Sequence, residues 1–230
     1  MDHKTKAILT EGWLAQFSAA FSDALLAEGT LMRIGRGTTV YNAGEDHCCL
    51  YGVVKGSLRF VITMNEQPPR FAHLVGPGTW FGENELVLGR SAILEVTSAT
   101  DATLFRLNQV QFERLLESHP VGWRAIAALS TMNVGLAIGS VDDLMIRDPR
   151  QRVCAVLLRL AAQPNAPQGQ PPMDTLALTQ TDLSTAANLS RSKTAEILGS
   201  LAAAGAVETI YGGLKIVRAE ILETELAKTM

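Results

Sequence analysis

Short runs of β-branched and aromatic residues, separated by glycines, dominate the chain from Thr30 to Leu107. Stretches such as GRGTTVYNAGED, LYGVVKGSLRFVI and ILEVTSATDATLFRL have the strand-and-turn spacing of an antiparallel barrel or sandwich. Lys55-Gly56 predicts a tight turn between two of these strands. Ahead of this region, apolar residues at helical spacing over residues 10–27 predict an amphipathic helix or a helix pair.

A longer helical pattern follows the strands. Residues 109–119 predict one helix, and Pro120 opens a second helix that we expect to run to about Ile146. Along one side of the second helix, apolar side chains recur at steps of three or four residues, which is the spacing of a helix-pairing seam. We therefore expect a homodimer, and the alternative is a helix buried on its own domain. The dimerisation residues are predicted to be Ile126, Leu129, Met132 and Leu136.

The sequence IRDPRQR interrupts this pattern and predicts a hinge between domains. Asp148 is in position to cap the next helix, and Pro149 fits its first turn. The proline-rich stretch at 163–174 then predicts an exposed loop. We divide the chain into three segments. These are a strand-rich region with flanking helices over 1–119, a dimerisation helix and hinge over 120–147, and a C-terminal domain over 148–230.

The last segment has the pattern of a helix-turn-helix followed by a hairpin. TQTDLSTAA and SRSKTAEIL predict two helices joined by about four residues, and Gly212-Gly213 predicts the tip of the hairpin. Asn188 falls at the turn between the helices, where asparagine tolerates a positive φ. The inner face is predicted to contain Ala186, Leu189, Ile197 and Leu201.

The second helix opens on polar and basic side chains. A helix N-terminus directs its amides, its dipole and its first side chains toward phosphates and base edges, so we interpret this helix as the recognition helix. The alternative is a helix-turn-helix used only for packing. The predicted DNA-binding residues are Thr179, Ser190, Arg191, Ser192, Lys193 and Glu196.

Composition limits the possible classes of protein. At 230 residues, with 47% hydrophobic and 19% charged residues, the chain is expected to fold into two domains. A net charge of −3 argues against a protein that coats nucleic acid indiscriminately, although it allows a local basic patch. We see no signal peptide and no apolar run of about 18 residues, which predicts a cytoplasmic protein with no membrane partner. Three cysteines, two of them adjacent, do not predict a disulfide framework.

The order of these patterns resembles the CRP/FNR family of bacterial transcription regulators over nearly the whole chain. The stretches that carry the resemblance are GTTVYNAGED, LYGVVKGSLRF, GPGTWFGENELVLGRSA, RDPRQRVCAVLLRLA and LTQTDLSTAANLSRSKTAEILGSLAAAGAVE. The resemblance implies an α+β fold with an N-terminal antiparallel β-roll of the cyclic-nucleotide-binding type, a long dimerisation helix and a C-terminal winged helix-turn-helix. It also implies a homodimer that reads a two-fold operator in double-stranded DNA, with RNA polymerase as a further partner.

The resemblance implies an effector site in the roll. In members that bind a cyclic nucleotide, a Gly-Glu pair holds the ribose hydroxyl and an Arg-Ser pair holds the cyclic phosphate. The matching residues are Gly82 and Glu83, followed by Arg90 and Ser91, and a hydroxyl acceptor with an anion-binding guanidinium suits that chemistry. Leu136 of the long helix is assigned to the same pocket.

Two departures from the family pattern leave the effector open. The segment between the two pairs is about three residues shorter than usual and carries a further acid, Glu85. The Thr-Ser pair that contacts adenine in the cyclic AMP receptor falls at Ala137 and Ile138, which have no side-chain hydrogen bond to offer. A cyclic nucleotide, another small or apolar effector, or no diffusible ligand all remain possible. In the last case Arg90 is expected to form a salt bridge to Glu83 or Glu85.

The recognition helix also departs from the family. Members that read the usual half-site carry Glu directly after the Arg or Val that opens this helix, and Arg four residues further on. Here those positions hold Ser192 and Glu196. Loss of an acceptor for cytosine and of a bidentate donor to guanine predicts an operator that differs from the usual half-sites.

Other cofactors and classes of protein fit the sequence less well. The N-terminus lacks the cysteine run of an iron-sulfur cluster. A haem iron would need His47, His73 or Cys48 as its ligand, and the HCCL stretch with Cys48 and Cys49 could sense oxidants. Scattered histidines argue against a cupin, and no hydrolase or P-loop motif is present, so we predict neither a metal site nor an enzyme. The remaining alternative is a regulatory effector-binding module that acts on a protein partner.

Overall fold

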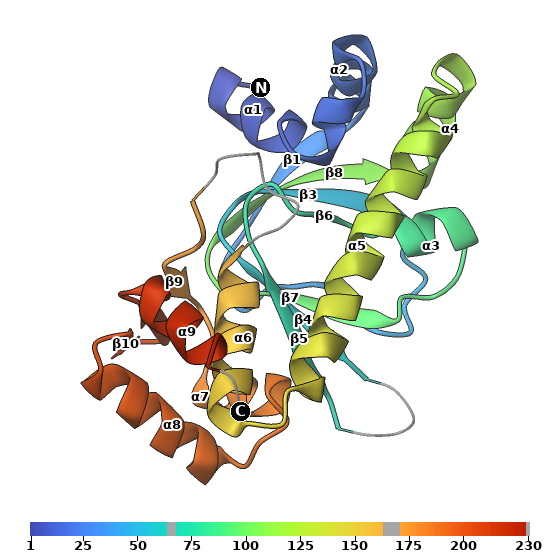
Figure 1. The fold of residues 1–230 in the computed structure, drawn as a ribbon. Helices are drawn as coiled ribbons and strands as arrows, with labels where there is room; N and C mark the ends of the chain where they lie inside the picture. Colours follow the sequence, from blue (N-terminus) through green and yellow to red (C-terminus); the bar gives the residue numbers. More distant parts are fainter. Residues whose placement is uncertain (64–67, 163–170, 229–230) are drawn as a thin grey trace.

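The computed structural model describes residues 1–63, 68–162 and 171–228. Two antiparallel four-stranded sheets form the N-terminal β-roll, with strand orders β1-β8-β3-β6 and β2-β7-β4-β5 (Figure 1). The α+β class with this roll is therefore confirmed. The strands of the roll are β1 (Thr30–Ile34), β2 (Thr39–Tyr41), β3 (Cys49–Lys55), β4 (Leu58–Ile62), β5 (Arg70–Val75), β6 (Trp80–Phe81), β7 (Leu94–Ser98) and β8 (Ala102–Asn108).

Short helices border the roll at its N-terminal end. The expected helix pair corresponds to the 3₁₀ helix η1 (Trp13–Gln16) and α2 (Ala19–Glu28). An additional helix, α1 (His3–Thr10), precedes them and was not predicted, because it buries only two side chains and has a weak apolar pattern. The indole nitrogen of Trp80 donates a 3.2 Å hydrogen bond to the carbonyl of Leu9, which fixes α1 on the sheet.

The two predicted central helices are present. They are α4 (Gln109–Ser118) and α5 (Gly122–Met145). A short helix, α3 (Glu83–Leu88), contacts α5 from the roll. The long helix starts two residues later than expected, after Pro120, and ends one residue earlier than expected.

The structure corrects the predicted pairing seam of α5. Ile126 and Leu129 are 3% and 0% exposed in the core that α5 shares with the N-terminal helices and the roll, so a second chain cannot reach them. Met132 and Leu136 are half-buried. The alternative of burial on its own domain therefore holds for the first half of the helix. The apolar side chains exposed in its second half are Val134, Ile138, Val141, Leu144 and Met145.

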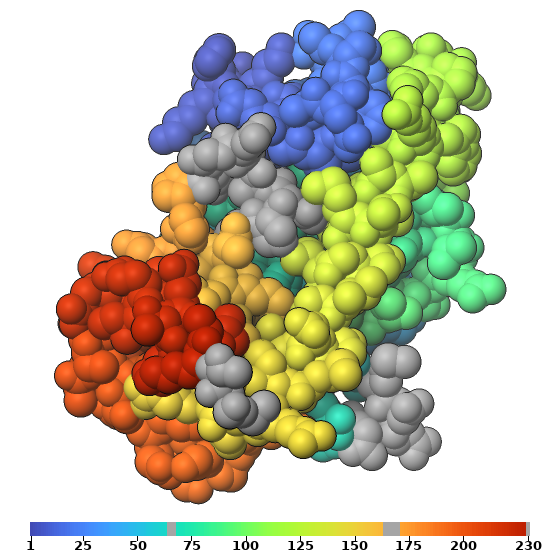
Figure 2. Space-filling model, in the orientation of Figure 1, coloured from blue at the N-terminus to red at the C-terminus, as the bar shows by residue number. Residues whose placement is uncertain are grey.

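The uncovered face of α5 is long. Figure 2 shows it as a diagonal band of yellow-green atoms between the roll and the C-terminal part. Within the described residues, α5 is the one helix whose length and mean hydropathy of 1.3 fit a membrane span, by length and composition only. One such helix is weak evidence for a membrane span, and the charged residues Arg124, Asp142 and Asp143 lie on it.

The C-terminal part is a winged helix-turn-helix. Its sheet has the strand order β10-β11-β9, and Asp148 caps the first helix, accepting a 2.8 Å hydrogen bond from the amide of Gln151. The expected exposed loop lies mostly outside the described residues. The elements are α6 (Pro149–Ala162), β9 (Thr175–Leu176), α7 (Gln180–Ala186), α8 (Arg191–Ala203), β10 (Val207–Ile210), β11 (Gly213–Ile216) and α9 (Ala219–Leu226).

The roll and the C-terminal part share one apolar core. Phe71 and Leu74 of β5 belong to the same buried cluster as Leu157 of α6 and Leu183 of α7. The first helix of the helix-turn-helix therefore rests on a strand of the roll (Figure 1).

A polar contact lies beside this shared core. The Nε atom of Arg159 on α6 donates a 2.6 Å hydrogen bond to Asp143 at the end of α5, and Nη1 lies 3.1 Å from Nδ1 of His73 on β5. A guanidinium only donates, so His73 has to accept and is neutral at this nitrogen. Burial, together with the positive charge of Arg159, lowers the pKa of His73 to about 3.

This contact predicts a loss of stability in mild acid. Because the pKa of His73 is lower in the folded chain than in the unfolded chain, protons bind the unfolded state below about pH 6.5 and destabilise the fold. His73→Gln keeps an acceptor for Arg159 and removes this titration. From pH 7.5 to 5.5 we expect the wild-type protein to lose about 1 kcal/mol more unfolding free energy than His73→Gln, measured by urea denaturation. The exposed His3→Gln is the control, and equal losses for wild type and His73→Gln would contradict the assignment.

Candidate nucleic-acid interface and effector pocket

The first turn of α8 is exposed to solvent and is capped by a side chain. Ser190 is the N-cap, and its Oγ atom accepts a 3.2 Å hydrogen bond from the amide of Lys193. The same atom lies 3.1 Å from Oγ of Ser192. Arg191 and Ser192 are exposed. The structure thus brings these four predicted residues together at one helix end, where amides and a positive dipole favour phosphate.

Glu196 changes the charge of this surface. Its Oε1 atom lies 2.8 Å from Nζ of Lys193, three residues earlier on the same helix. Such an exposed pair adds little stability, so contact with a phosphate can replace it. In the free chain Arg191 is therefore the basic side chain of the first turn without a described ionic partner.

Beyond its first turn, the exposed face of α8 is made of small residues. Ala195, Gly199, Ala202 and Ala203 are exposed there, while Ile197 and Leu201 are buried as predicted. A helix with short side chains on its outer face can approach the floor of a major groove about 12 Å wide. Specific contacts are then concentrated at the N-terminal end of α8.

The preceding helix, α7, is capped by Thr179 as predicted. This cap occupies the Thr179 hydroxyl that was predicted to contact DNA. Thr179 and Asp182 form a capping box, in which the Thr179 hydroxyl donates a 2.8 Å hydrogen bond to Oδ2 of Asp182. That hydroxyl hydrogen is not free for a phosphate, so the structure assigns Thr179 to helix capping. At the turn between α7 and α8, Asn188 has a φ of +49°, as expected.

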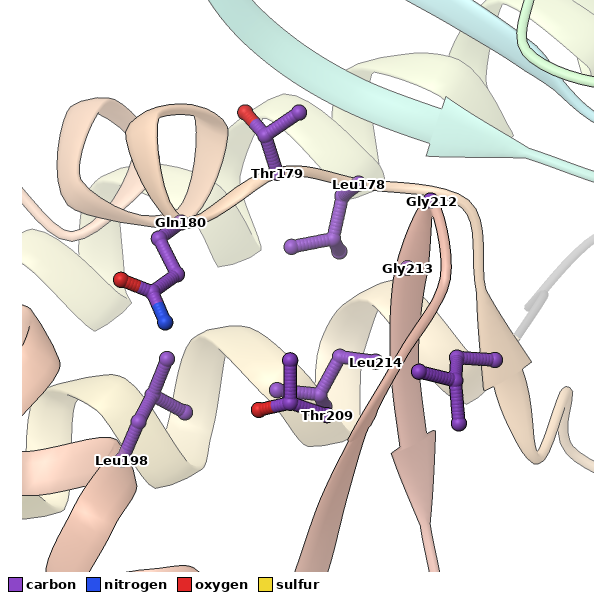
Figure 3. Close-up of a pocket in the computed structure, with 9 residues that line it drawn as sticks. Leu178, Thr179, Gln180, Leu198, Thr209, Gly212, Gly213 and Leu214 are labelled. Atoms are coloured by element: carbon purple, nitrogen blue, oxygen red, sulfur yellow. The ribbon is translucent and has the colours of Figure 1, made fainter.

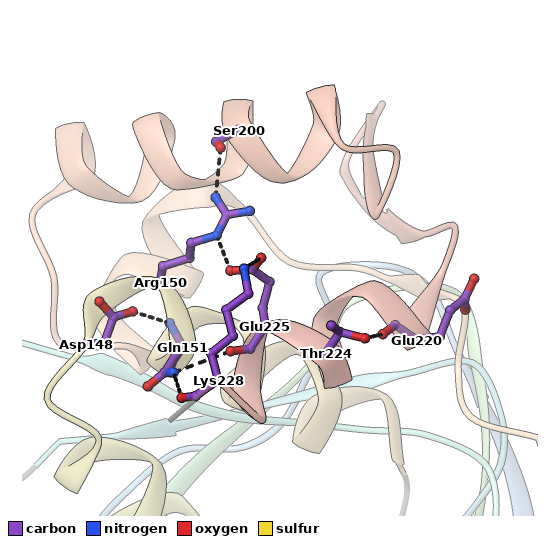
Figure 4. A network of polar contacts seen from close by, with 8 residues as sticks. All are labelled: Asp148, Arg150, Gln151, Ser200, Glu220, Thr224, Glu225 and Lys228. Carbon is purple, nitrogen blue, oxygen red and sulfur yellow. Dashed lines mark hydrogen bonds and ion pairs between the residues drawn. The ribbon is translucent and has the colours of Figure 1, made fainter. Parts of the chain in front are cut away.

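A polar network that the sequence did not reveal joins α8 to α6 and α9 (Figure 4). Arg150 at the start of α6 donates through Nε to Glu225 of α9 at 2.6 Å and through Nη1 to Ser200 of α8 at 2.8 Å. Lys228 also pairs with Glu225, and hydrogen bonds from Lys228 and Arg150 lower the pKa of that carboxyl. Ser200 and Glu225 are 50 and 75 residues from Arg150 in sequence, so no local pattern could indicate these two contacts.

A pocket of about 180 Å³ separates α8 from the wing (Figure 3). Leu178, Leu198 and Leu214 line it, with Gln180 and Thr209 as polar neighbours. Pockets for drug-sized ligands usually measure about 300–1,000 Å³. We therefore interpret this space as imperfect packing between the hairpin and the helices.

In the roll, the predicted Gly-Glu pair lies at the start of α3. Gly82 has a φ of +93°, and a Cβ atom there would lie 2.1 Å from the carbonyl oxygen of Cys49, so the position requires glycine. Glu83 is 3% exposed, and its Oε1 atom accepts a 2.8 Å hydrogen bond from Asn133 of α5. Burial raises the pKa of Glu83. Asn133 was missed in the sequence, although a lone amide in an apolar helix is a usable signal.

The predicted Arg-Ser pair does not join Glu83 in this structure. Arg90 is exposed and has no ionic partner among the described residues, so the expected alternative of a salt bridge from Arg90 to Glu83 or Glu85 is wrong. Ser91 donates a 2.7 Å hydrogen bond to Oδ1 of Asp46. A closed cradle for an anion is therefore not assembled here.

Stacked rings lie between the two sheets of the roll. Tyr41 stacks on His47 with ring centroids 4.7 Å apart, and His47 lies parallel to Tyr51 at 5.5 Å. Phe81 follows at 5.1 Å from Tyr51, with Phe60 at its edge. Nε2 of His47 lies 2.5 Å from the hydroxyl of Tyr51, and burial raises the pKa of that hydroxyl. Large side chains thus fill this part of the space between the two sheets of the roll.

The candidate haem and redox residues each have other contacts. His73 pairs with Arg159, and His47 lies in the aromatic stack. The thiol of Cys48 lies 3.6 Å from the carbonyl oxygen of Glu85, and Arg106 donates to the sulfur of Cys49 at 3.4 Å. Among the described residues, no three potential metal ligands come together.

Comparison with known proteins agrees with both halves of this description. Residues 31–119 match the family model of the cyclic nucleotide-binding domain, and residues 151–225 match that of the Crp-like helix-turn-helix domain. The cyclic AMP receptor protein of Thermus thermophilus is 27% identical over 82% of this chain and 84% of its own. The transcriptional regulator SdrP of the same organism is 26% identical over 78% and 84%.

Solved structures show the same fold. FixK2 from Bradyrhizobium japonicum superposes with a TM-score of 0.70 at 17% identity, over 88% of this chain and 99% of that one. A sensor-type β-roll joined by a long helix to a Crp-like helix-turn-helix defines a DNA-binding transcription regulator. The chain belongs to the CRP/FNR family of these regulators.

The first turn of α8 predicts opposite effects for two substitutions. Arg191→Ala removes a phosphate or guanine contact and should cost about 1–3 kcal/mol of specific DNA binding. Glu196→Gln releases Lys193 and removes a carboxylate that phosphate repels, so it should strengthen binding. Affinities are measured by fluorescence anisotropy at one fixed salt concentration, with the exposed Arg33→Ala on β1 as the control. An unchanged affinity for Arg191→Ala would show that α8 contacts DNA elsewhere.

Proposed function

We propose that this regulator binds double-stranded DNA as a homodimer, with one α8 in each half of a two-fold operator. The observation that carries the proposal is the exposed first turn of α8, where Ser190, Arg191, Ser192 and Lys193 come together. Its partners are then operator DNA, a second copy of the chain and RNA polymerase. With these partners, we infer that the protein acts in the cytoplasm.

The operator is proposed to differ from the usual family half-sites. Ser192 is exposed and can pair with a donor or an acceptor, and Glu196 cannot donate to guanine. Specificity then depends on Arg191, Lys193 and the cost of bending the site.

Selection on random DNA tests the function and the operator together. The purified full-length chain should enrich one two-fold motif that is neither TGTGA-like nor TTGAT-like. A TGTGA-like or TTGAT-like motif would show that the register assigned to the residues of α8 is wrong. Because an effector is proposed to gate binding, the selection is run on the protein as purified from its host, with any ligand that stays bound, and enrichment of no motif by that protein would contradict DNA reading itself.

The homodimer is proposed to form along the exposed second half of α5. Val134, Ile138 and Val141 recur there at steps of three or four residues and are 57%, 63% and 58% exposed in the single chain. Such spacing matches the seam of paired helices, and burial of these side chains by a second α5 would remove them from water.

This assignment predicts which substitutions split the dimer. Ile138→Asp should bury an unpaired charge and give monomers at micromolar concentration, whereas Val110→Asp on the exposed face of α4 should leave the dimer intact. Leu129→Asp should unfold the chain instead, since Leu129 is inside its own core. Native mass spectrometry reports the oligomeric state, and a dimeric Ile138→Asp would place the seam elsewhere.

A small effector other than cyclic AMP is proposed to gate DNA binding. Glu83 is bonded to Asn133, Arg90 is exposed, and Ala137 and Ile138 offer adenine no side-chain hydrogen bond. Native mass spectrometry of the protein as purified from its host also reports the mass of any ligand that stays bound.

A further inference from the structure

One ion pair crosses directly from the roll to the helix-turn-helix. The guanidinium of Arg59 on β4 donates to both carboxylate oxygens of Asp182 on α7, with Nη1 at 2.6 Å from Oδ2 and Nη2 bonded to Oδ1. The same guanidinium lies over the ring of Phe71, 5.3 Å from its centroid. Two parallel hydrogen bonds fix orientation as well as distance, unlike a single point contact.

Asp182 connects this ion pair to the start of the helix-turn-helix. Its side chain is 8% exposed, and Oδ2 also accepts hydrogen bonds from the amide and the hydroxyl of Thr179 at 2.7 and 2.8 Å. Burial opposes ionisation, but the hydrogen bonds from Arg59 and Thr179 outweigh it and lower the pKa of Asp182. A buried carboxylate is costly without its partner, so movement of α7 away from β4 is strongly opposed.

Strand β4 also reaches the interior of the roll. Side chains alternate between the two faces of a strand, and Phe60 follows Arg59 directly. The ring of Phe60 lies at the edge of Phe81, with centroids 5.2 Å apart, in the aromatic stack between the sheets. One strand therefore has one side in the roll interior and the other against the first helix of the helix-turn-helix.

We propose that Arg59 is a positioning residue for DNA binding, which sets the orientation of α7, and with it α8, relative to the roll. The inference deepens the proposed function and rests on it. Arg59 lies on the roll and reaches the helix-turn-helix only through Asp182, so it acts on DNA through α7. A displacement of Phe60 in the roll interior would move Arg59 on the same strand, which gives β4 a place in effector control.

The fold is expected to tolerate substitutions that remove this contact. Loss of Arg59 leaves the Arg159 contacts with Asp143 and His73, and the shared core around Phe71 and Leu74, in place. Asp182→Asn keeps an acceptor for the cap of α7 and removes the charge that binds Arg59. Arg33 on β1 is exposed, so Arg33→Met is the matched control.

The experiment measures two properties of the full-length chain. The first is the affinity for the DNA motif selected by the wild-type protein, and the second is amide hydrogen exchange over Gln180–Ala186. Arg59→Met and Asp182→Asn should each weaken binding about tenfold and accelerate exchange in α7, and Arg59→Lys should restore part of both. The double variant should be no weaker than the worse single variant, because both changes remove one interaction.

Several outcomes would overturn the proposal. Wild-type affinity in Arg59→Met, stronger binding, unchanged exchange in α7, or losses that multiply in the double variant each contradict a positioning role. A wild-type protein that selects no DNA motif when purified from its host, with any ligand that stays bound, contradicts the proposed function instead. In that case, exchange in α7 still decides whether Arg59 holds this helix.

Discussion

The burial of one face of α5 against the roll is the constraint on which the remaining arrangement depends. Ile126 and Leu129 fix the first half of the helix in the N-terminal core. With that face fixed, Asn133 is directed at Glu83 about one turn after Leu129, and Asp143 at the far end is directed at Arg159. One helix thereby contacts the N-terminal core, α3 of the roll and α6 of the helix-turn-helix part.

The same constraint determines which surface of α5 stays exposed for a partner. Since the inner face is occupied, the apolar side chains on the opposite side of the second half have no intramolecular cover. Contiguous apolar surface of this kind marks interaction sites in soluble proteins. The helix thus has one apolar face that is buried in its own chain and a second that is exposed, and Asn133 and Asp143 make its polar contacts with other parts of the same chain.

Features that depend on a few neighbouring residues could be predicted from the sequence. The caps at Asp148 and Thr179 and the turn at Asn188 are decided within about four residues, and each is present. The choice of face on α5 could not be predicted, because both faces are apolar and only the folded roll distinguishes them. Pairing of Arg59 with Asp182 joins residues 123 positions apart, which no local periodicity can indicate. The motif match at Arg90 identified a residue type but not its surroundings, and its guanidinium is exposed.

The aromatic stack fills space between the two sheets of the roll that an empty pocket would leave open to a ligand. Tyr41, His47, Tyr51 and Phe81 are in mutual contact between the sheets, so a ligand that enters this region has to displace side chains that are already packed. Close-packed interiors respond to such a displacement by changing to another arrangement and not by gradual deformation. Phe60 contacts this stack and Arg59 binds Asp182 of α7, and both residues lie on β4. A displaced stack and a reoriented α7 would therefore both involve this strand. Under the proposed effector control, entry of a ligand would therefore be coupled through β4 to movement of the helix-turn-helix.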